Sequence, residues 1–316
     1  MKKITVLFTI FIILTSIILV QFTFAKTNIS EKTSVNESEK MYIYERNLIT
    51  KETTRREIDS YNNLSRTLSN ISNVSMEPYI PEGIEEVSEN NNPISPRAIV
   101  GEDNRTLANT SQFPFSCIGY LSINNGAGRG TAFMVDDNIA ITAAHCVVGQ
   151  DYIQFYPGST VDSHPYGEAW VTRYIWAGGE DYTGGVDFED DWAILVLDTD
   201  VGDNSGWLGV SNMAEYPNGP SGWVGLLANV SGYPQDKGWD QWHAVGNILT
   251  ATDKVLTIDT DTWMCNSGSP TYKYNGGHYA YGILVGEYNS STNPYNFVTR
   301  FNDRVYSAIM DAKATY

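Results

Sequence analysis

Between Phe115 and Phe301 the sequence consists of short apolar or alternating stretches separated by turn residues. The stretches are 115–123, 131–135, 139–143, 152–156, 169–176, 192–197, 223–230, 243–250, 254–258, 279–285 and 296–301. Their length, and their separation by Gly, Asn and Asp, are typical of a β-sandwich or barrel and not of alternating strands and helices. Helical spacing is found only from Asn302 to about Ala312, where Asn302 is the predicted N-cap. We therefore predict an all-β fold with a short C-terminal helix.

The first 25 residues, MKKITVLFTIFIILTSIILVQFTFA, combine a basic start, a long apolar run and a small residue at the end. This pattern is typical of a secretory signal peptide over residues 1–25. The apolar run is also long enough for an uncleaved membrane anchor. We expect a secreted, extracellular protein that has no stable membrane association once the signal peptide is removed.

Residues 26–97 are rich in Glu, Asn, Ser and Lys and contain no Cys, Trp or Phe. We expect such a stretch to bury little apolar surface. It ends in NNNPISPR, which is typical of an exposed linker that a protease can reach. We interpret 26–97 as a propeptide that is cut between Arg97 and Ala98. The alternative is a disordered tail that stays attached.

Residues 98–316 suit one large domain, and this domain is strongly acidic. It contains 25 Asp and Glu against 9 Lys and Arg, which gives a net charge of −16. Such a charge disfavours nucleic acid and anionic membrane surfaces as partners. We expect a monomer whose partners are protein or peptide substrates and its own propeptide.

The sequence contains three cysteines, Cys117, Cys146 and Cys265. In an exported protein an odd count leaves at least one thiol unpaired or paired between chains. There is no CxxC pair and no Cys/His cluster that would suggest zinc. We expect neither a metal nor a cofactor.

Three segments carry residues that together can perform nucleophilic catalysis. The stretch TWMCNSGSP contains Ser267 and is, by itself, most simply a turn of small residues. His145 in ITAAHCV follows an apolar strand, and Asp191 in FEDDWAILVLD precedes one. A neutral imidazole that a carboxylate orients beside a hydroxyl group makes Ser a nucleophile. The neighbouring acids, which we interpret as a solvated loop, are Asp187, Glu189 and Asp190.

The segments TAAHC, DWAILVL and NSGSP resemble the triad segments of chymotrypsin-like serine proteases. Together with IVGEDNRTLANTSQFPF, VSGYPQDK, DTWMCNSGSPTY and YNFVTRF, they resemble most closely the bacterial glutamyl endopeptidase branch, over most of 98–316. The resemblance implies a serine protease domain of two six-stranded antiparallel barrels, with a boundary near 205–220 and the active site in the cleft between them. It also implies Ser267 as nucleophile, His145 as general base, Asp191 as its orienting carboxylate, and the N–H groups of Cys265 and Ser267 as the oxyanion hole.

The sequence departs from this family pattern at several positions. Cys265 stands where chymotrypsin-like enzymes usually have Gly, and Asn266 replaces the Asp that receives the new N-terminal ammonium in animal digestive enzymes. The usual partner of Cys146 would precede GTAF, but Gly128 and Arg129 stand there. If the barrel is as expected, Cys117 lies on a neighbouring strand, and we predict a Cys117–Cys146 disulfide.

The resemblance leaves the residue before the scissile bond, P1, open. In the glutamyl branch a His on the strand after the nucleophile helps to neutralise the substrate Glu, but the equivalent position here is about Leu284. Glu287 nearby would repel an acidic side chain. Asp261 lies six residues before Ser267, where trypsin-like enzymes place the Asp that binds Arg or Lys. We expect Asp261, Thr262, Leu284 and Glu287 around the substrate pocket, with acidic, basic and apolar P1 residues all possible.

The sequence therefore predicts a secreted serine endopeptidase that is made as a zymogen and acts through an acyl-enzyme. The alternative is a catalytically weak homologue that serves as a binding or adhesion module on the same fold. Cys265, Leu284 and the missing family disulfides favour this alternative, whereas the presence of His145, Asp191 and Ser267 speaks against it.

Overall fold

The computed structural model describes residues 41–58, 75–87, 103–180, 182, 187–213, 219–288 and 294–316. The predicted signal peptide and the predicted cut between Arg97 and Ala98 lie outside these residues. Within the described ranges, no helix is both long and apolar enough to cross a bilayer.

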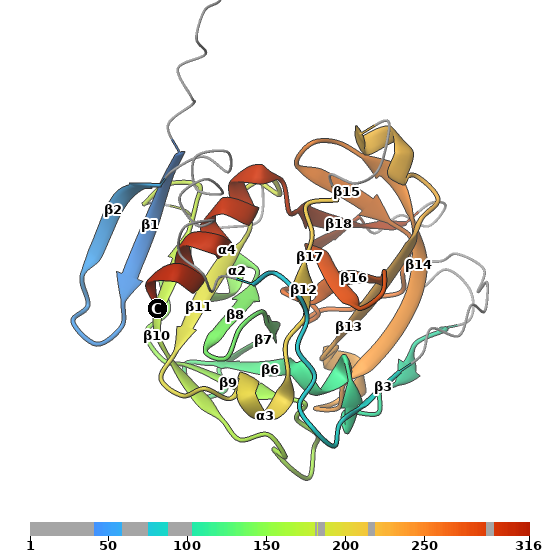
Figure 1. Ribbon diagram of the computed structural model, residues 1–316, viewed down its shortest axis with the longest axis horizontal. Helices are drawn as coiled ribbons and strands as arrows, with labels where there is room; N and C mark the ends of the chain where they lie inside the picture. The colour runs from blue at the N-terminus through green and yellow to red at the C-terminus, as the bar shows by residue number, and fades with distance from the viewer. Residues whose placement is uncertain are drawn as a thin grey trace, which may run out of the picture. The chain divides into compact units, whose positions relative to one another are not determined.

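Six antiparallel strands close the first barrel (Figure 1). Their order is β11-β8-β7-β6-β9-β10, and β10 pairs back onto β11. The bounds are β6 Ile118–Ile123, β7 Gly128–Met134, β8 Ile139–Thr142, β9 Ile153–Pro157, β10 Ala169–Trp176 and β11 Ala193–Leu197. Every residue of β6, β8 and β11 is buried. Since the residues of a barrel strand face the interior and the exterior in turn, the outer faces of these three strands are covered as well.

The second barrel repeats this architecture with strands from the second half of the chain. The order β17-β16-β13-β14-β15-β18 is closed by pairing of β17 with β18. The bounds are β13 Leu227–Gly232, β14 Trp242–Ala251, β15 Val255–Ile258, β16 Pro270–Tyr274, β17 His278–Tyr288 and β18 Tyr295–Arg300. Two short strands attach at its edges, β4 Thr106–Leu107 on β14 and β12 Gly209–Val210 on β17. The predicted pair of six-stranded antiparallel barrels is confirmed.

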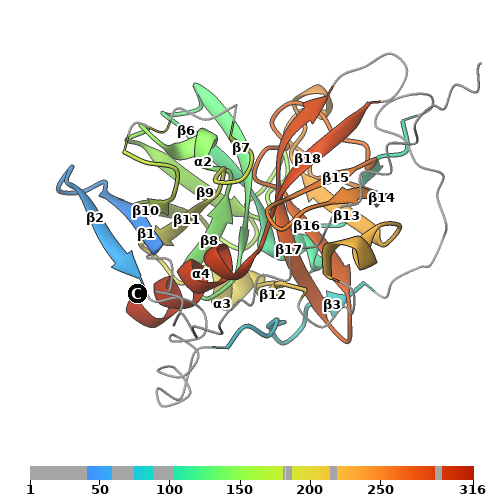
Figure 2. The same cartoon turned by 90° about the horizontal axis from the view of Figure 1, so that it is seen from above.

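Short helical turns occupy the connections, and one longer helix ends the chain. The turns are η1 Phe115–Cys117, α2 Ala144–Val147, α3 Gly202–Ser205, η2 Gly219–Trp223 and η3 Gln235–Lys237. The C-terminal helix α4, Asp303–Thr315, begins as predicted, because Asn302 Oδ1 accepts hydrogen bonds from the N–H groups of Arg304 and Val305. Val305 and Ile309 belong to an apolar cluster with residues of both barrels. Lys313 near the end of α4 donates to the Val135 carbonyl at 2.7 Å, so α4 packs alongside the first barrel (Figure 2).

Part of the predicted propeptide is folded onto the first barrel. Strands β1, Met41–Asn47, and β2, Thr53–Ile58, form a hairpin, and β1 pairs antiparallel with β10 (Figure 1). Ile43 is fully buried and Ile58 is 5% exposed. Glu45 accepts a hydrogen bond from Arg173 of β10. The expectation that this stretch buries little apolar surface is therefore wrong for 41–58, because its alternating pattern fits an additional strand.

A second described segment of the predicted propeptide, residues 75–87, also contacts the domain. Tyr79 forms a bridge with Trp207, and the two rings lie 4.4 Å apart. Strand β3, Glu85–Glu86, pairs in parallel with β5, Gln112–Phe113. Glu86 lies 3.0 Å from His278 Nδ1 of the second barrel. These contacts attach the segment to both barrels.

The predicted disulfide is absent, since Cys117, Cys146 and Cys265 are all free thiols. The Cys117 Sγ faces Pro114, whose carbonyl oxygen lies 3.1 Å away. The residue that faces Cys146 is Gly130 of β7. A Cβ built on Gly130 would lie 3.2 Å from Cys146 Sγ and 3.7 Å from Cys146 Cβ, within the range of a disulfide.

Replacing Gly130 with Cys is therefore expected to create a disulfide with Cys146. Closing a loop of this length stabilises the folded state by about 3 kcal/mol in the chain-entropy model. Thiol titration in denaturant and a thermal melt measure the two effects. Gly128→Cys is the matched control, because a Cβ at Gly128 faces Ile123 instead. If all thiols of the Gly130→Cys variant stay free in air, Gly130 of β7 does not face Cys146 of α2.

Candidate active site

His145 and Asp191 meet at one end of the first barrel. Strands β8 and β11 are antiparallel, with Thr142 opposite Ala193. Helix α2 begins two residues after Thr142, and Asp191 lies two residues before Ala193, so α2 and Asp191 lie side by side. His145 Nδ1 lies 2.7 Å from Asp191 Oδ2, and the His145 backbone N–H donates to Asp191 Oδ1 at 2.9 Å. Asp191 is fully buried. The carboxylate thus fixes the ring so that Nδ1 carries a proton and Nε2 is left as the acceptor.

The same contact changes the acidity of the imidazole. Burial of the ring disfavours its charged form and lowers the pKa of His145. Hydrogen bonding to Asp191 and to Cys146 raises it, and the net result is a pKa above the ordinary 6.5. The neutral form, which can accept a proton, therefore gains population as the pH rises.

Ser267 is held between the two barrels by its backbone. The N–H of Thr131 in β7 donates to the Ser267 carbonyl at 2.9 Å, and the N–H of Gly268 donates to the Leu284 carbonyl of β17 at 2.8 Å. Gly268 has a φ of +90°, and a Cβ there would lie 1.9 Å from the Thr131 carbonyl oxygen. Only glycine fits, which explains the Ser-Gly step of NSGSP.

The backbone N–H groups of Cys265 and Ser267 make no hydrogen bond to any residue that the structure describes. The Met264 carbonyl accepts a hydrogen bond from the Gln235 N–H at 2.8 Å. Because a trans peptide points its C=O and N–H in opposite directions, the N–H of Cys265 points away from Gln235. Among the described residues, neither this N–H nor that of Ser267 has an acceptor. The pair can serve an oxyanion.

The backbone of Cys265 is strained in this arrangement. Its φ of 72° lies in the left-handed region, which costs roughly 1–2 kcal/mol for a residue that carries a Cβ. Strain of this kind persists where the surrounding structure enforces it and is common at functional sites. The Cys265 carbonyl is held by the Thr131 hydroxyl at 3.2 Å.

A buried ion network supports the loop that contains Gln235. Arg105 is 6% exposed and pairs with Asp103 at 2.9 Å and with Asp236 at 2.6 Å. Lys237 also pairs with Asp103 at 2.9 Å. The start of the domain is thereby fixed to η3, whose first residue positions the Met264 carbonyl.

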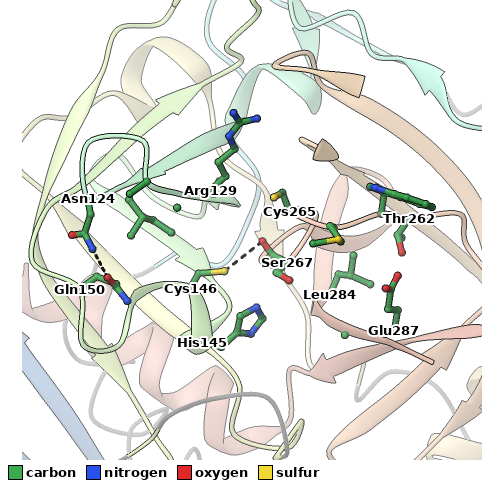
Figure 3. A pocket seen from close by; sticks show the side chains of 16 residues that line it. Asn124, Arg129, His145, Cys146, Gln150, Thr262, Cys265, Ser267, Leu284 and Glu287 are labelled. Carbon is green, nitrogen blue, oxygen red and sulfur yellow. Dashed lines mark hydrogen bonds between the residues drawn. The ribbon is translucent and has the colours of Figure 1, made fainter. Parts of the chain in front are cut away.

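A pocket of about 540 Å³ contains His145 and Ser267. Figure 3 shows Thr262, Leu284 and Glu287 on one side of Ser267, and Asn124, Gln150 and Arg129 on the other. The pocket is lined by Ile123, Asn124, Ala127, Gly128, Arg129, His145, Cys146, Gln150, Thr262, Trp263, Met264, Cys265, Ser267, Leu284, Gly286 and Glu287. The site therefore lies between the two barrels.

One residue predicted for the substrate pocket is placed elsewhere. Asp261 is 2% exposed and does not line the pocket. Its Oδ2 accepts a hydrogen bond from the N–H of Asn104 at 3.0 Å, and burial raises the pKa of its carboxyl group. Both residues follow β15, which ends at Ile258, and in this connecting segment Thr262 lines the pocket while Asp261 is turned to the interior.

Comparison with known proteins identifies the family. A family profile described as Trypsin matches residues 104–309. The chain belongs to the trypsin family. The chain is also 32% identical over 238 residues to the Extracellular metalloprotease of Bacillus subtilis (strain 168), which covers 72% of this chain and 73% of that protein. As a trypsin-family member with protease relatives, the protein is a serine endopeptidase.

Solved structures agree with this assignment at the level of the fold. A Glu endopeptidase in complex with MPD superposes with a TM-score of 0.59 and 24% identity, over 69% of this chain and all of that one. The protease Anisep from Arthrobacter nicotinovorans gives a TM-score of 0.51 and 17% identity, over 64% and 97%. The predicted chymotrypsin-like fold is confirmed.

The name of the Bacillus relative refers to a metalloprotease. In the part of this trypsin-family chain that the structure describes, no three His, Cys, Asp or Glu side chains gather as a group that could hold a metal ion. The pocket instead contains His145 and Ser267, and the buried Asp191 binds His145.

Sequence reasoning did not identify Thr131 or the pairing of Arg105 with Asp236. Arg105 and Asp236 lie in two segments that carry the family resemblance, IVGEDNRTLANTSQFPF and VSGYPQDK, and Thr131 lies in GTAF. A Thr inside an apolar strand and a D-x-R sequence each occur widely, and only the fold shows that they meet the loop of Ser267.

Replacing Asp191 with Asn is expected to lower kcat by roughly 10⁴-fold, because Asn stabilises the wrong tautomer of His145. In the unmodified enzyme, kcat/KM should rise with pH through an apparent pKa above 6.5, since protonated His145 cannot accept the Ser267 proton. Steady-state kinetics on a peptide without titratable groups measures both.

Asp190→Asn is the matched control, because Asp190 pairs with Arg304 and not with His145. Its activity should stay within a few-fold of the unmodified enzyme. Loss of activity in Asp190→Asn with retention in Asp191→Asn would reverse the assignment of the two neighbouring acids.

Proposed function

We propose that this serine endopeptidase is secreted as a zymogen and that His145, Asp191 and Ser267 form its catalytic triad. The observation that carries the proposal is the 2.7 Å contact of His145 Nδ1 with Asp191, in a pocket that also contains Ser267. Ser267 Oγ attacks the scissile carbonyl carbon while His145 Nε2 takes its proton. Asp191 stabilises the imidazolium that forms.

The remaining steps use the same groups. The N–H groups of Cys265 and Ser267 donate to the oxyanion, each contributing about 3 kcal/mol of barrier reduction. His145 returns the proton to the leaving amine as the bond to the carbonyl carbon breaks. Water then attacks the acyl-enzyme with His145 as base, and Ser267 is released with its proton restored.

The side chain that best suits the substrate pocket has an apolar stem and a cationic end. Leu284 and Met264 offer apolar surface, and Leu284 is buried. Glu287 is exposed, and its carboxylate turns toward Thr262 beside Leu284 (Figure 3). A Lys or Arg at P1 can contact this carboxylate, whereas Glu would meet like charge. We therefore propose a basic P1 residue.

Secretion is supported by the N-terminal 25 residues and by the name of the Bacillus relative, which describes that protein as extracellular. Activation by a cut near Arg97 fits the proposed basic P1, because the enzyme itself could make that cut. None of the described residues of 41–58 and 75–87 lines the pocket. We propose that the cut acts through the start of the domain, where Arg105 and Asn104 contact Asp236 and Asp261.

The test is a digest of a diverse peptide mixture by the processed domain, with mass spectrometry of the product ends. Cuts after Lys or Arg are expected, and Ser267→Ala should make none. Glu287→Gln should lower kcat/KM for basic P1 peptides roughly fivefold, since an exposed ion pair is worth up to about 1 kcal/mol.

Glu168→Gln, which removes an exposed carboxylate outside the pocket, is the control and should change little. Cuts after Glu or Asp would refute the basic preference while leaving the triad intact. A folded domain that makes no cuts would instead support the binding-module alternative.

A further inference from the structure

A positively charged residue lies on the far side of Ser267 from the substrate pocket. Arg129 of β7 lines the cleft and is two residues before Thr131, whose N–H binds the Ser267 carbonyl. A Cβ on Gly130, between them, would lie 3.5 Å from the same carbonyl oxygen. On the opposite side of Ser267, the Leu284 carbonyl accepts a hydrogen bond from the N–H of Gly268. Leu284 lines the proposed pocket for the P1 side chain. Arg129 therefore faces the residues that follow the scissile bond.

The Arg129 guanidinium is held by stacking and not by an ion pair. Its Cζ lies 3.7 Å from the centre of the Trp239 ring. Trp239 packs in turn edge-on against Tyr120, with ring centres 4.9 Å apart. A guanidinium stacked on an aromatic face keeps its N–H groups in the ring plane, where they can bind a carboxylate in bidentate fashion.

No described residue accepts a hydrogen bond from the N–H groups of Arg129. Arg129 has no hydrogen bond and no ion pair within the described ranges, although the domain has a net charge of −16. By contrast, six other arginines each have a carboxylate within 4 Å; these are Arg46, Arg56, Arg105, Arg173, Arg300 and Arg304. A half-buried, unpaired guanidinium in a cleft is a site for an external carboxylate.

A second cavity lies on the side of Arg129 where Trp239 stacks on it. Trp239 lines this cavity of about 540 Å³ together with Tyr120, Tyr156 and His164. The ring of His164 lies 4.6 Å from that of Tyr156. An extended peptide leaving Ser267 along β7 would pass the guanidinium and then meet these rings.

We propose that Arg129, supported by Trp239, is a specificity-determining residue that binds an Asp or Glu within the first three residues after the scissile bond. This proposal rests on the proposed function, because it needs a peptide bound across Ser267. It adds a requirement on the leaving-group side that is independent of the P1 residue.

The test uses peptides that carry the P1 residue selected in the digest. In one set Glu is moved through the three positions after the cut, and in the matched set Gln takes its place. For at least one position we expect the unmodified enzyme to cleave the Glu peptide with about five- to tenfold higher kcat/KM, and the ratio should fall as salt is added. Arg129→Gln should bring the ratio close to one, whereas Arg129→Lys should retain part of it.

Two further variants distinguish the support that the Trp239 ring gives to Arg129 from an effect of the net charge of the protein. Trp239→Leu should reduce the Glu-to-Gln ratio, because the guanidinium loses its support. Lys254→Gln removes one positive charge from an exposed site that pairs with Glu189, and it should keep the ratio of the unmodified enzyme.

A ratio near one in the unmodified enzyme, or an unchanged ratio in Arg129→Gln, overturns the proposal. Reaction of Ser267 with a fluorophosphonate and cleavage of the Gln peptides test the proposed function separately. If the unmodified protein does neither, the proposed function fails and the role of Arg129 fails with it. If it does both without preferring Glu, only the role of Arg129 fails.

Discussion

The contact of Thr131 with the loop of Ser267 is the constraint on which the site depends. Thr131 is fully buried, and its N–H and hydroxyl group bind the carbonyls of Ser267 and Cys265, while its own carbonyl accepts from Thr142. The first barrel thus fixes a loop that belongs to the second barrel. Ser267 is brought beside His145, and Cys265 is kept in a left-handed conformation that directs its N–H away from Gln235. A cleft between two rigid barrels is a general place for such a site.

Much of this arrangement could be predicted from the sequence. The periodicity of short strands predicts an all-β sandwich or barrel, whereas the pair of barrels and the contact of His145 with Asp191 are what the resemblance to chymotrypsin-like proteases implies. The start of α4 at Asn302 follows from local capping chemistry alone. The strand periodicity and the helix cap are local, so sequence patterns carry them, whereas the pairing of β8 with β11, strands separated in the chain by β9 and β10, follows only from the family resemblance.

The errors arise where a distant partner decides the outcome. The stretch 41–58 looks too polar to fold, but Ile43 and Ile58 are buried because β10 offers an open edge. Cys146 faces Gly130 and not Cys117. Which side chains of β7 point toward Cys146 depends on the register of the strand. Asp261 is turned inward in the segment after β15, where its carboxylate binds the N–H of Asn104, 157 positions away. The pairing of Arg105 with Asp236 joins residues 131 positions apart, and no local sequence pattern predicts it.

The central claim is that Ser267 is an activated nucleophile, and the most direct measurement is its rate of reaction with a fluorophosphonate. Labelling of the processed domain followed by peptide mapping should place the label on Ser267, at a stoichiometry near one per chain. Ser267→Ala should not react, and Asp191→Asn should react far more slowly at neutral pH. A folded domain that reacts no faster than Ser267→Ala would contradict the account, because the contact between His145 and Asp191 would then be present without activating the serine.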